Sequence, residues 1–384
     1  MRYFIQYPAG TGKLVVDAVS NFVENFSVRY QDDSAMLFDS TSSAERVSLL
    51  PFAKNAFVVL ADIPRKDVNQ SALQLAQRLD KGDFSALRGR VSGFRIMAHV
   101  DGELASLAPG VKTGFERAVS ANTGGRVEPR GSCQEFWLIG RLDLRDLMFC
   151  ARLPKRKRPK KARGAVSHEL SSMLVLASRP GDQDVFLDPF GGSGSFALSR
   201  AEMPARDIVY SDLDLASHRR EFPDELIRDK RVRLLSEDAL TLTSIPDGSV
   251  DVIVTDPPWG EYEELPMPYP EFTQSVSESF ARVLRPTTGR FVLMCARRGA
   301  ADFRQSLEGA GFTIDTTHDI LVNGHPATVF VGSSSGTPTA EPSTRRKSAA
   351  KDEGAPRAET SHRPDKPLLR GMSTQRRAMS RFSR

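Results

Sequence analysis

The stretch VDVIVTDPPWGEY, residues 250–262, joins a short apolar run to a rigid corner. The run VDVIV is typical of a buried strand, and Asp256, Pro257, Pro258 and Trp259 follow it. The two prolines fix the backbone and remove two donors, and a residue before proline is held extended. The corner therefore presents a carboxylate, a free carbonyl and a flat aromatic ring at a strand end. These residues alone would equally fit a turn with an exposed tryptophan, so the rest of the chain has to decide.

Around this corner, short apolar segments alternate with longer amphipathic ones. Such a rhythm predicts a parallel sheet covered by helices on both faces. The last two apolar segments, FTIDTTHDI and ATVFVG, are joined by LVNGHP, and a short Asn-Gly connection favours a hairpin. We therefore predict an α/β fold with a Rossmann-like sheet that ends in an antiparallel hairpin. The predicted parallel strands are 184–188, 208–212, 232–236, 250–256 and 290–296.

Four aspartates stand where four successive predicted strands end: Asp188, Asp212, Asp238 and Asp256. Open parallel sheets bind ligands outside the carboxyl ends of their strands. An acid placed like Asp212 can hold both ribose hydroxyls of an adenosine cofactor, and Asp238 can accept from an adenine amino group. Each aspartate could instead cap a helix. Four of them in register, together with a glycine-rich loop and the Pro-Pro corner, favour a ligand site.

The glycine-rich loop lies in FLDPFGGSGSF, residues 186–196. Gly191, Gly192 and Gly194 would let the backbone turn tightly and approach a ligand. The spacing differs from the dinucleotide pattern G-x-G-x-x-G, because Ala197 stands at the third position. Asp188 would repel a pyrophosphate but attract a cation or an amino group. A plain turn remains the alternative for the loop by itself.

The N-terminal half has a different pattern. Residues 1–65 are typical of a small α+β module, and residues 66–150 of a second one. In the second module, the spacing of apolar residues predicts a helix over 68–80, a half-buried strand in GFRIMAHVD, a helix around Phe115, and a hairpin from EFWLIGRL and DLMFCARL.

Charge is distributed unevenly along the 384 residues, whose formal net charge is +5. The segment 151–166 holds eight basic residues and no acid, and the segment 333–384 holds 12 Lys and Arg against 5 Asp and Glu. Such blocks suit a polyanionic partner, although a solvated hinge and a solubilising tail would share this composition. The tail is also rich in Ser, Thr, Pro and Ala, and we expect it to be disordered.

The remaining composition points to a cytoplasmic protein. Three distant cysteines suggest neither a disulfide framework nor a zinc site, and no apolar run is long enough to span a bilayer. The first residues, MRYFIQYPAG, lack the pattern of a signal peptide. We expect no membrane partner and no metal.

DPFGGSG followed by DPPW resembles the class I S-adenosylmethionine-dependent methyltransferases that act on exocyclic amino groups. GFRIMAHVDGE, RVEPRGSCQEFWLIG and HELSSMLVLA extend the resemblance to the THUMP-domain RNA methyltransferases over about residues 1–332. Two positions depart from the family. Gly191 stands where Cys is frequent, which we expect to be harmless, and Trp259 stands where Tyr or Phe is commoner.

The resemblance implies a domain order and a reaction. The order is a ferredoxin-like module at 1–65, a THUMP-like RNA-binding domain at 66–150, a basic linker at 151–166, a methyltransferase domain at 167–332 and a tail at 333–384. The implied product is N2-methylguanosine. The resemblance favours tRNA as the substrate, with rRNA as the alternative. Three alternatives remain. A DNA amino-methyltransferase acting on adenine N6 or cytosine N4 shares the corner, whereas a glutamine-directed protein methyltransferase generally has Asn at position 256. The third alternative is a non-catalytic RNA-binding module.

The same resemblance assigns roles to residues. Asp256 and the Pro257 carbonyl would each take one N–H of the acceptor amine, Pro258 would stiffen the corner, and Trp259 would stack on the base. The residues expected to bind S-adenosylmethionine are Asp188, Phe190, Gly191, Gly192, Gly194, Asp212, Asp238 and Ala239.

Overall fold

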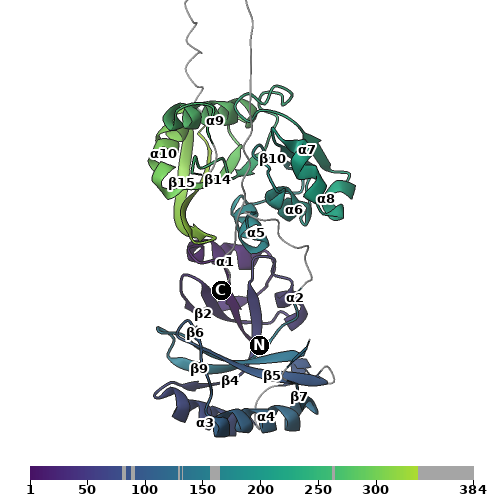
Figure 1. Ribbon diagram of the computed structural model, residues 1–384, viewed down its shortest axis with the longest axis vertical. Coiled ribbons are helices and arrows are strands. Elements are labelled where there is room, and N and C mark those ends of the chain that lie inside the picture. The colour runs from purple at the N-terminus through teal and green to yellow at the C-terminus, as the bar shows by residue number, and fades with distance from the viewer. Residues whose placement is uncertain are drawn as a thin grey trace, which may run out of the picture. The chain divides into compact units, whose positions relative to one another are not determined.

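The computed structural model describes residues 1–79, 84–87, 91–128, 130–131, 133–155, 165–261 and 264–335. Within these residues the strands form two sheets, one from the N-terminal half and one from the C-terminal half (Figure 1). The predicted tail beyond residue 335 and residues 156–164 of the predicted basic linker lie outside the described part.

The first sheet has the strand order β2-β3-β1-β4-β9-β8-β5-β6, and β7 pairs with β5. Its strand β4 pairs with β1 on one side and β9 on the other, so the sheet continues across the module boundary expected at residue 65. The predicted hairpin of the second module is confirmed by the antiparallel pair β8 and β9. The strands are β1 Arg2–Gln6, β2 Phe26–Gln31, β3 Ala35–Ser40, β4 Asn55–Pro64, β5 Gly93–Val100, β6 Glu103–Leu104, β7 Arg126–Val127, β8 Gln134–Gly140 and β9 Asp146–Arg152.

The helices of this half contribute to one hydrophobic core on one face of the sheet. They are α1 Gly12–Ser20, α2 Ala44–Ser48, α3 Val68–Arg78 and α4 Pro109–Thr123, with a short 3-10 turn at Ser85–Leu87. The helix predicted from apolar spacing over 68–80 is confirmed as α3, and the apolar residues Ala72, Leu75, Ala76 and Leu79 are all buried. A smaller cluster that includes Phe4, Phe57 and Ile139 occupies the other face.

The second sheet has the order β12-β11-β10-β13-β14-β16-β15. Strands β10 to β14 run parallel, and β16 runs antiparallel to both β14 and β15. The predicted fold class is therefore confirmed. The hairpin turns at Asn323 and Gly324, both with positive φ, as an Asn-Gly turn requires. The strands are β10 Val185–Asp188, β11 Asp207–Ser211, β12 Val232–Leu235, β13 Val252–Thr255, β14 Arg290–Ala296, β15 Phe312–Val322 and β16 His325–Ser334.

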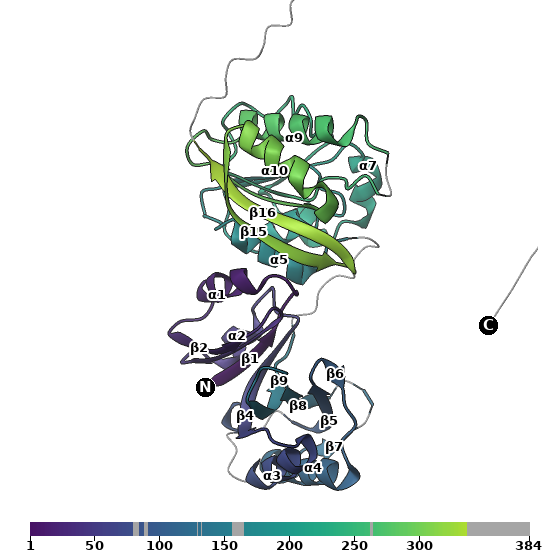
Figure 2. The ribbon, with the colours of Figure 1, turned by 90° about the vertical axis from the view of Figure 1, so that its left-hand side faces the viewer.

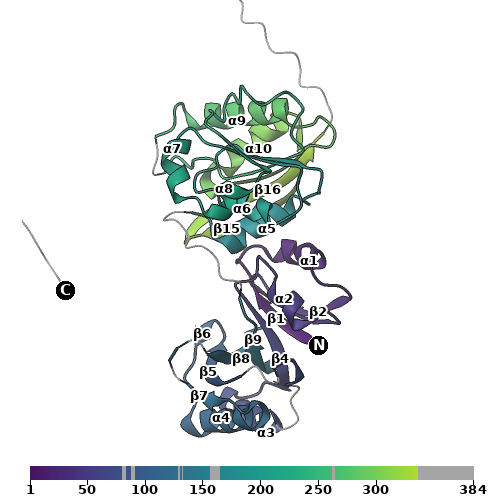
Figure 3. The same ribbon diagram turned by 90° about the vertical axis from the view of Figure 1, so that its right-hand side faces the viewer.

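Helices cover both faces of this sheet, as its nearly continuous burial demands. On one face α9 and α10 pack against the strands, and Figure 2 shows these two helices beside the β15–β16 hairpin. On the other face the core includes side chains of α5, α6 and α8. Figure 3 shows these three helices. The helices are α5 His168–Ala177, α6 Ser195–Ala201, α7 Leu215–His218, α8 Asp224–Arg228, α9 Tyr269–Val283 and α10 Ala300–Gly309, with 3-10 turns at Arg219–Glu221 and Arg297–Gly299.

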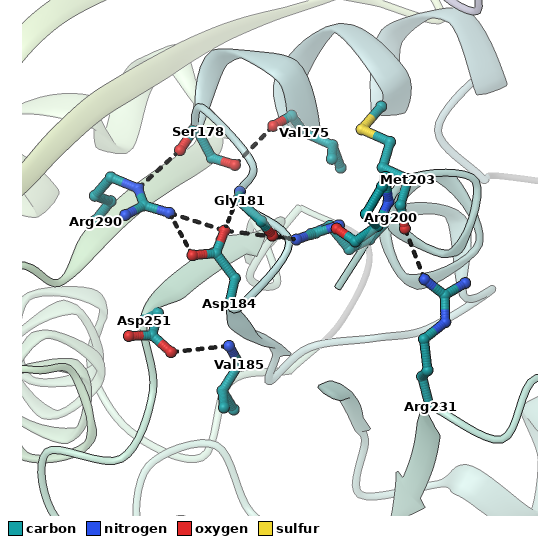
Figure 4. A network of polar contacts seen from close by, with 11 residues as sticks. Val175, Ser178, Gly181, Asp184, Val185, Arg200, Met203, Arg231, Asp251 and Arg290 are labelled. Atoms are coloured by element: carbon teal, nitrogen blue, oxygen red, sulfur yellow. Dashed lines mark hydrogen bonds and ion pairs between the residues drawn. The ribbon is translucent and has the colours of Figure 1, made fainter. Parts of the chain in front are cut away.

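A buried ionic network secures the amino end of the sheet, at the start of β10 (Figure 4). Asp184 accepts two hydrogen bonds of 2.9 Å from Arg290 and one of 2.6 Å from the Gly181 amide. Arg200, which is fully buried, donates to the carbonyls of Pro204 and Gly181, both at 2.6 Å, and lies 3.5 Å from the Asp184 carboxylate. Burial lowers the pKa of Arg200, and the charge of Asp184 opposes that shift.

Two basic residues of the linker expected at 151–166 have acidic partners. Arg152 pairs with Glu135 at 2.7 Å, and Lys155 pairs with Glu169 in the first turn of α5. These two cations are therefore partly neutralised by the protein itself. None of the helices within the described residues is long and apolar enough to cross a membrane.

Candidate active site

A cleft of ≈ 1170 Å³ lies along the carboxyl end of the second sheet. Nine of the twelve residues expected from the sequence line it: Phe190, Gly192, Asp212, Asp238, Ala239, Asp256, Pro257, Pro258 and Trp259. Parallel strands end at one edge, so the loops after β10, β11, β12 and β13 meet there. The tertiary structure thus brings the glycine-rich loop and the Pro-Pro corner to the same cleft.

The glycine-rich loop is fastened to the end of β11. The Gly192 amide donates to Asp212 Oδ2 at 2.9 Å, and Tyr210 Oη donates to the Gly192 carbonyl at 2.8 Å. Gly192 has a φ of +46°, and a Cβ built there would meet nothing within 4 Å. Because Gly192 lines the cleft, its missing side chain leaves room for a ligand against the backbone.

Gly191 is required for a different reason. A Cβ at this position would lie 2.2 Å from Tyr210 Cε2, and Tyr210 is fully buried with its ring against Phe222 at 5.0 Å. The tyrosine ring occupies the space that the family's more frequent cysteine would need. Glycine at position 191 therefore leaves the space that the Tyr210 ring fills, and the expectation that this departure is harmless stays a prediction.

We expect Gly191→Ala to lower both stability and cofactor affinity, because the Tyr210 ring that anchors the loop must move. Overpacking of this kind costs about 1–3 kcal/mol. Urea unfolding and calorimetric titration with cofactor would measure the two effects. The control Gly309→Ala adds the same methyl group at the end of α10, where a Cβ meets nothing within 4 Å. The second change Tyr210→Val should restore part of the loss, and failure to do so would contradict the steric explanation.

Asp212 and Asp238 lie where the sequence expected them. Asp212 accepts from the amides of Gly192 and Asp214, at 2.9 and 2.8 Å, and His218 Nε2 stands 3.7 Å from its carboxylate. Asp238 accepts from the Leu240 amide at 2.9 Å. These bonds orient both carboxylates while leaving each of them at the wall of the cleft.

Asp188 does not line the cleft. It is fully buried at the end of β10, where Oδ1 accepts a 2.9 Å hydrogen bond from Thr255 and Oδ2 has no partner among the described residues. Burial raises the pKa of Asp188 to about 8. The Thr255 hydrogen bond lowers this pKa, and the negative charges of Asp212 and Asp256 raise it further. A cationic ligand above the strand ends would relieve this unfavourable charge.

The raised pKa of Asp188 predicts that stability falls as pH rises. The native carboxyl keeps its proton up to about pH 8, whereas an ordinary aspartate releases it near 3.8. Its contribution to the free energy of unfolding is therefore complete below the ordinary pKa and is lost as pH approaches 8, by at most about 1.4 kcal/mol per pH unit. Urea titrations of ligand-free protein between about pH 5 and 8 should show this slope in wild type and not in Asp188→Asn. Parallel curves for the two proteins would contradict the assignment.

The corner at residues 256–259 also lines the cleft. Trp259 Nε1 donates to Asp256 Oδ1 at 2.7 Å, and both residues are half-buried. The Trp259 carbonyl accepts from Arg298 Nη2 at 3.3 Å, and Arg298 Nε lies 3.4 Å from Glu261. The corner is thus tied to the turn that follows β14.

Sequence reasoning missed several residues of the cleft. Leu213, His218, Glu237 and Leu240 neighbour predicted residues and could have been found by extending each motif. The hairpin residues Val322, Asn323 and His325 also line the cleft, and no local pattern indicated them. The other lining residues outside the prediction are Pro189, Glu261, Glu264, Leu265, Pro266 and Phe272. Gly191, Gly194 and Asp188 were predicted but stand behind the wall.

The geometry fits a cationic ligand that carries an adenosine. Positive charge above the strand ends would stabilise the buried Asp188 oxygen that has no partner among the described residues, and a ligand can approach the Gly192 backbone without meeting a side chain. The oriented carboxylates of Asp212 and Asp238 can accept from hydroxyl and amino groups. Among the described residues, no group of three or more His, Cys, Asp or Glu side chains is placed to hold a metal ion.

Comparison with known proteins supports this assignment. Residues 155–222 and 224–323 match the family model described as UPF0020, RMKL-like, methyltransferase domain. No curated protein sequence is similar enough to count as a match.

Three solved structures share the fold of most of the chain. TrmN from Thermus thermophilus has a TM-score of 0.67 at 21% identity, covering 87% of this chain and 99% of its own. SMU.472, described as a methyltransferase complexed with SAH, has a TM-score of 0.61 at 13% identity, covering 86% of this chain and 97% of its own. A predicted N6-adenine-specific DNA methylase from Listeria monocytogenes has a TM-score of 0.55 at 12% identity, covering 86% and 95%. The matched residues of this chain form a methyltransferase domain, and the match implies S-adenosylmethionine as the cofactor.

Proposed function

We propose that the protein transfers a methyl group from S-adenosylmethionine to an exocyclic amino group of a nucleobase in RNA, with guanosine N2 in tRNA as the preferred acceptor. One observation carries this proposal. The Asp256–Trp259 corner and the loop around Gly192 line the same cleft. A carboxylate for the acceptor amine therefore shares one cleft with the groups suited to the cofactor.

On the cofactor side, we assign Asp212 to the ribose hydroxyls, Asp238 and Ala239 to the adenine edge, and the loop around Gly192 to the amino-acid part. The buried Asp188 carboxyl lies beneath that part. A bound cation would favour loss of its proton, and the resulting carboxylate would supply negative charge there. Bound there, the cofactor supplies an electrophilic methyl group.

On the acceptor side, the lone pair of an exocyclic amine is delocalised into the base and has to be oriented. Asp256 can accept one N–H and the Pro257 carbonyl the other; no hydrogen bond within the described residues takes that carbonyl. The carboxylate also offsets the positive charge that develops on nitrogen and can receive its proton. The face of Trp259 would stack on the base, an interaction of about 1–3 kcal/mol.

The charge of the cleft explains how a polyanion would use it. Among the described residues, six carboxylates line it: Asp212, Glu237, Asp238, Asp256, Glu261 and Glu264. They favour a cationic cofactor and repel phosphate groups. A nucleic acid would therefore insert only an extruded base and keep its backbone outside.

RNA is preferred over DNA because of the parts outside the catalytic domain. The basic segment 151–166 precedes that domain, and the N-terminal sheet adds a second module of the kind expected to capture RNA. Phosphate contacts by such a segment give affinity without reading sequence.

Purified protein would be incubated with cofactor labelled in its methyl group and, separately, with unmodified tRNA, rRNA fragments and duplex DNA. We expect label in tRNA, and N2-methylguanosine on mass spectrometry of its nucleosides. Methylation of rRNA alone would reassign the substrate, and N6-methyladenine or N4-methylcytosine in DNA would replace the proposal. Cofactor binding without transfer to any nucleic acid would contradict it.

A further inference from the structure

The hydrogen bond between Trp259 and Asp256 has no equivalent when Tyr or Phe occupies the fourth position of the corner. Trp259 Nε1 lies 2.7 Å from Asp256 Oδ1. A phenyl ring has no donor, and a tyrosine hydroxyl stands at the far end of its ring. An indole N–H lies in the ring plane and on its edge. The contact is therefore a property of this chain rather than of the corner in general.

The two prolines make this contact important. An aspartate that begins a turn commonly accepts from backbone amides of the next residues. Pro257 and Pro258 have no N–H, so the first two amides after Asp256 are missing. The indole of Trp259 replaces them as a donor to the carboxylate, and Arg298 holds the same residue through its carbonyl at 3.3 Å.

We infer that Trp259 is a positioning residue for Asp256: its indole N–H holds Oδ1 and thereby orients the carboxylate toward the acceptor amine. This rests on the proposed function above. Because the N–H lies in the ring plane, one bond sets the ring and the carboxylate relative to each other. A base stacked on the ring then brings its amine to the carboxylate. The bond also stabilises the ionised form, so Asp256 stays charged and accepting at lower pH.

Fluorescence tests the contact without any acceptor. The chain contains two tryptophans, Trp137 and Trp259, so Trp137→Phe leaves Trp259 as the single indole reporter. Its emission should change in one step with pH, as Asp256 takes up a proton and loses its charge. The step should vanish when Asp256→Asn is added and persist when Asp238→Asn, a neighbouring cleft carboxylate, is added instead. If Asp256→Asn leaves the pH dependence of Trp259 emission unchanged while circular dichroism stays native, the inference is overturned.

The pH dependence of methyl transfer tests the role. Trp259→Phe keeps an aromatic face and removes the donor, whereas Trp259→Leu removes both. In single-turnover assays the acidic limb of the Phe variant should move up by about one pH unit, so that its rate falls ~10-fold near the limb and recovers in alkali. The Leu variant should be slow at every pH, because stacking is lost.

The outcomes separate this inference from the proposed function. A Phe variant that is slowed equally at all pH values shows a merely structural tryptophan and overturns the positioning role. A wild-type enzyme that methylates no nucleic acid refutes the proposed function, and the positioning role falls with it. In that case the fluorescence step still decides whether the Trp259–Asp256 contact forms.

Discussion

Asp256→Asn is expected to slow methyl transfer by about 10²–10⁴-fold at saturating cofactor and RNA. The amide keeps the shape of the side chain and can still accept from Trp259, but it carries no charge and takes up no proton. The affinity for cofactor should change little, because Asp256 belongs to the corner and not to the loop around Gly192. Rapid-quench transfer assays and calorimetry would measure the two quantities on the same preparation.

A matched control removes charge just outside the cleft. Glu271 is exposed in the first turn of α9 and does not line the cleft, so Glu271→Gln should leave the rate within about two-fold. An Asp256→Asn enzyme that turns over at the control's rate would show that the corner is only structural. Equal loss in both variants would point to net charge rather than to a positioned carboxylate.

Asp184→Ala is expected to cost about 3–5 kcal/mol of unfolding free energy, the usual result of removing one partner from a buried charge pair. Asp184 is 7% exposed, and its loss would leave Arg200, which is fully buried, without a neutralising carboxylate. Arg290 and the Gly181 amide would also lose their acceptor (Figure 4). Urea unfolding of cofactor-free protein measures the change.

The control for the Asp184→Ala prediction removes one partner from an exposed ion pair in the same domain. Asp224 and Arg228 pair at 2.6 Å on α8 with exposed fractions of 72% and 78%, so Asp224→Ala should cost no more than about 0.5 kcal/mol. Similar losses for the two variants would contradict a special role of the buried network. Because Asp184 stands at the amino end of β10, the methyl-transfer chemistry of the folded fraction should be unchanged.

Much of the catalytic domain could be predicted from local patterns. The five strands β10 to β14 and the Asn-Gly hairpin followed from runs of apolar residues and from the turn preference of Asn323-Gly324. The sequence also indicated where Asp212, Asp238 and Asp256 would meet. These signals suffice because the carboxyl ends of parallel strands lie at one edge, so position along each strand predicts position in space.

The sequence could not show which side chains face the cleft. Asp188 ends a strand like the other three aspartates, yet it is buried beneath the site with a pKa of about 8. Nor could it show that Tyr210, from the neighbouring strand, fills the side-chain space at Gly191. His325 reaches the cleft from a hairpin some 70 residues beyond the corner.

The sequence by itself therefore determined the fold class, the edge of the sheet that binds ligand, and the residue types gathered there. Only the tertiary structure decided the burial of Asp188, the need for glycine at 191 and the bond from Trp259 to Asp256. The physical reason is that the position of each strand along the chain follows from local apolar patterns. Burial, charge and hydrogen bonding depend instead on neighbours that packing brings together from distant parts of the chain.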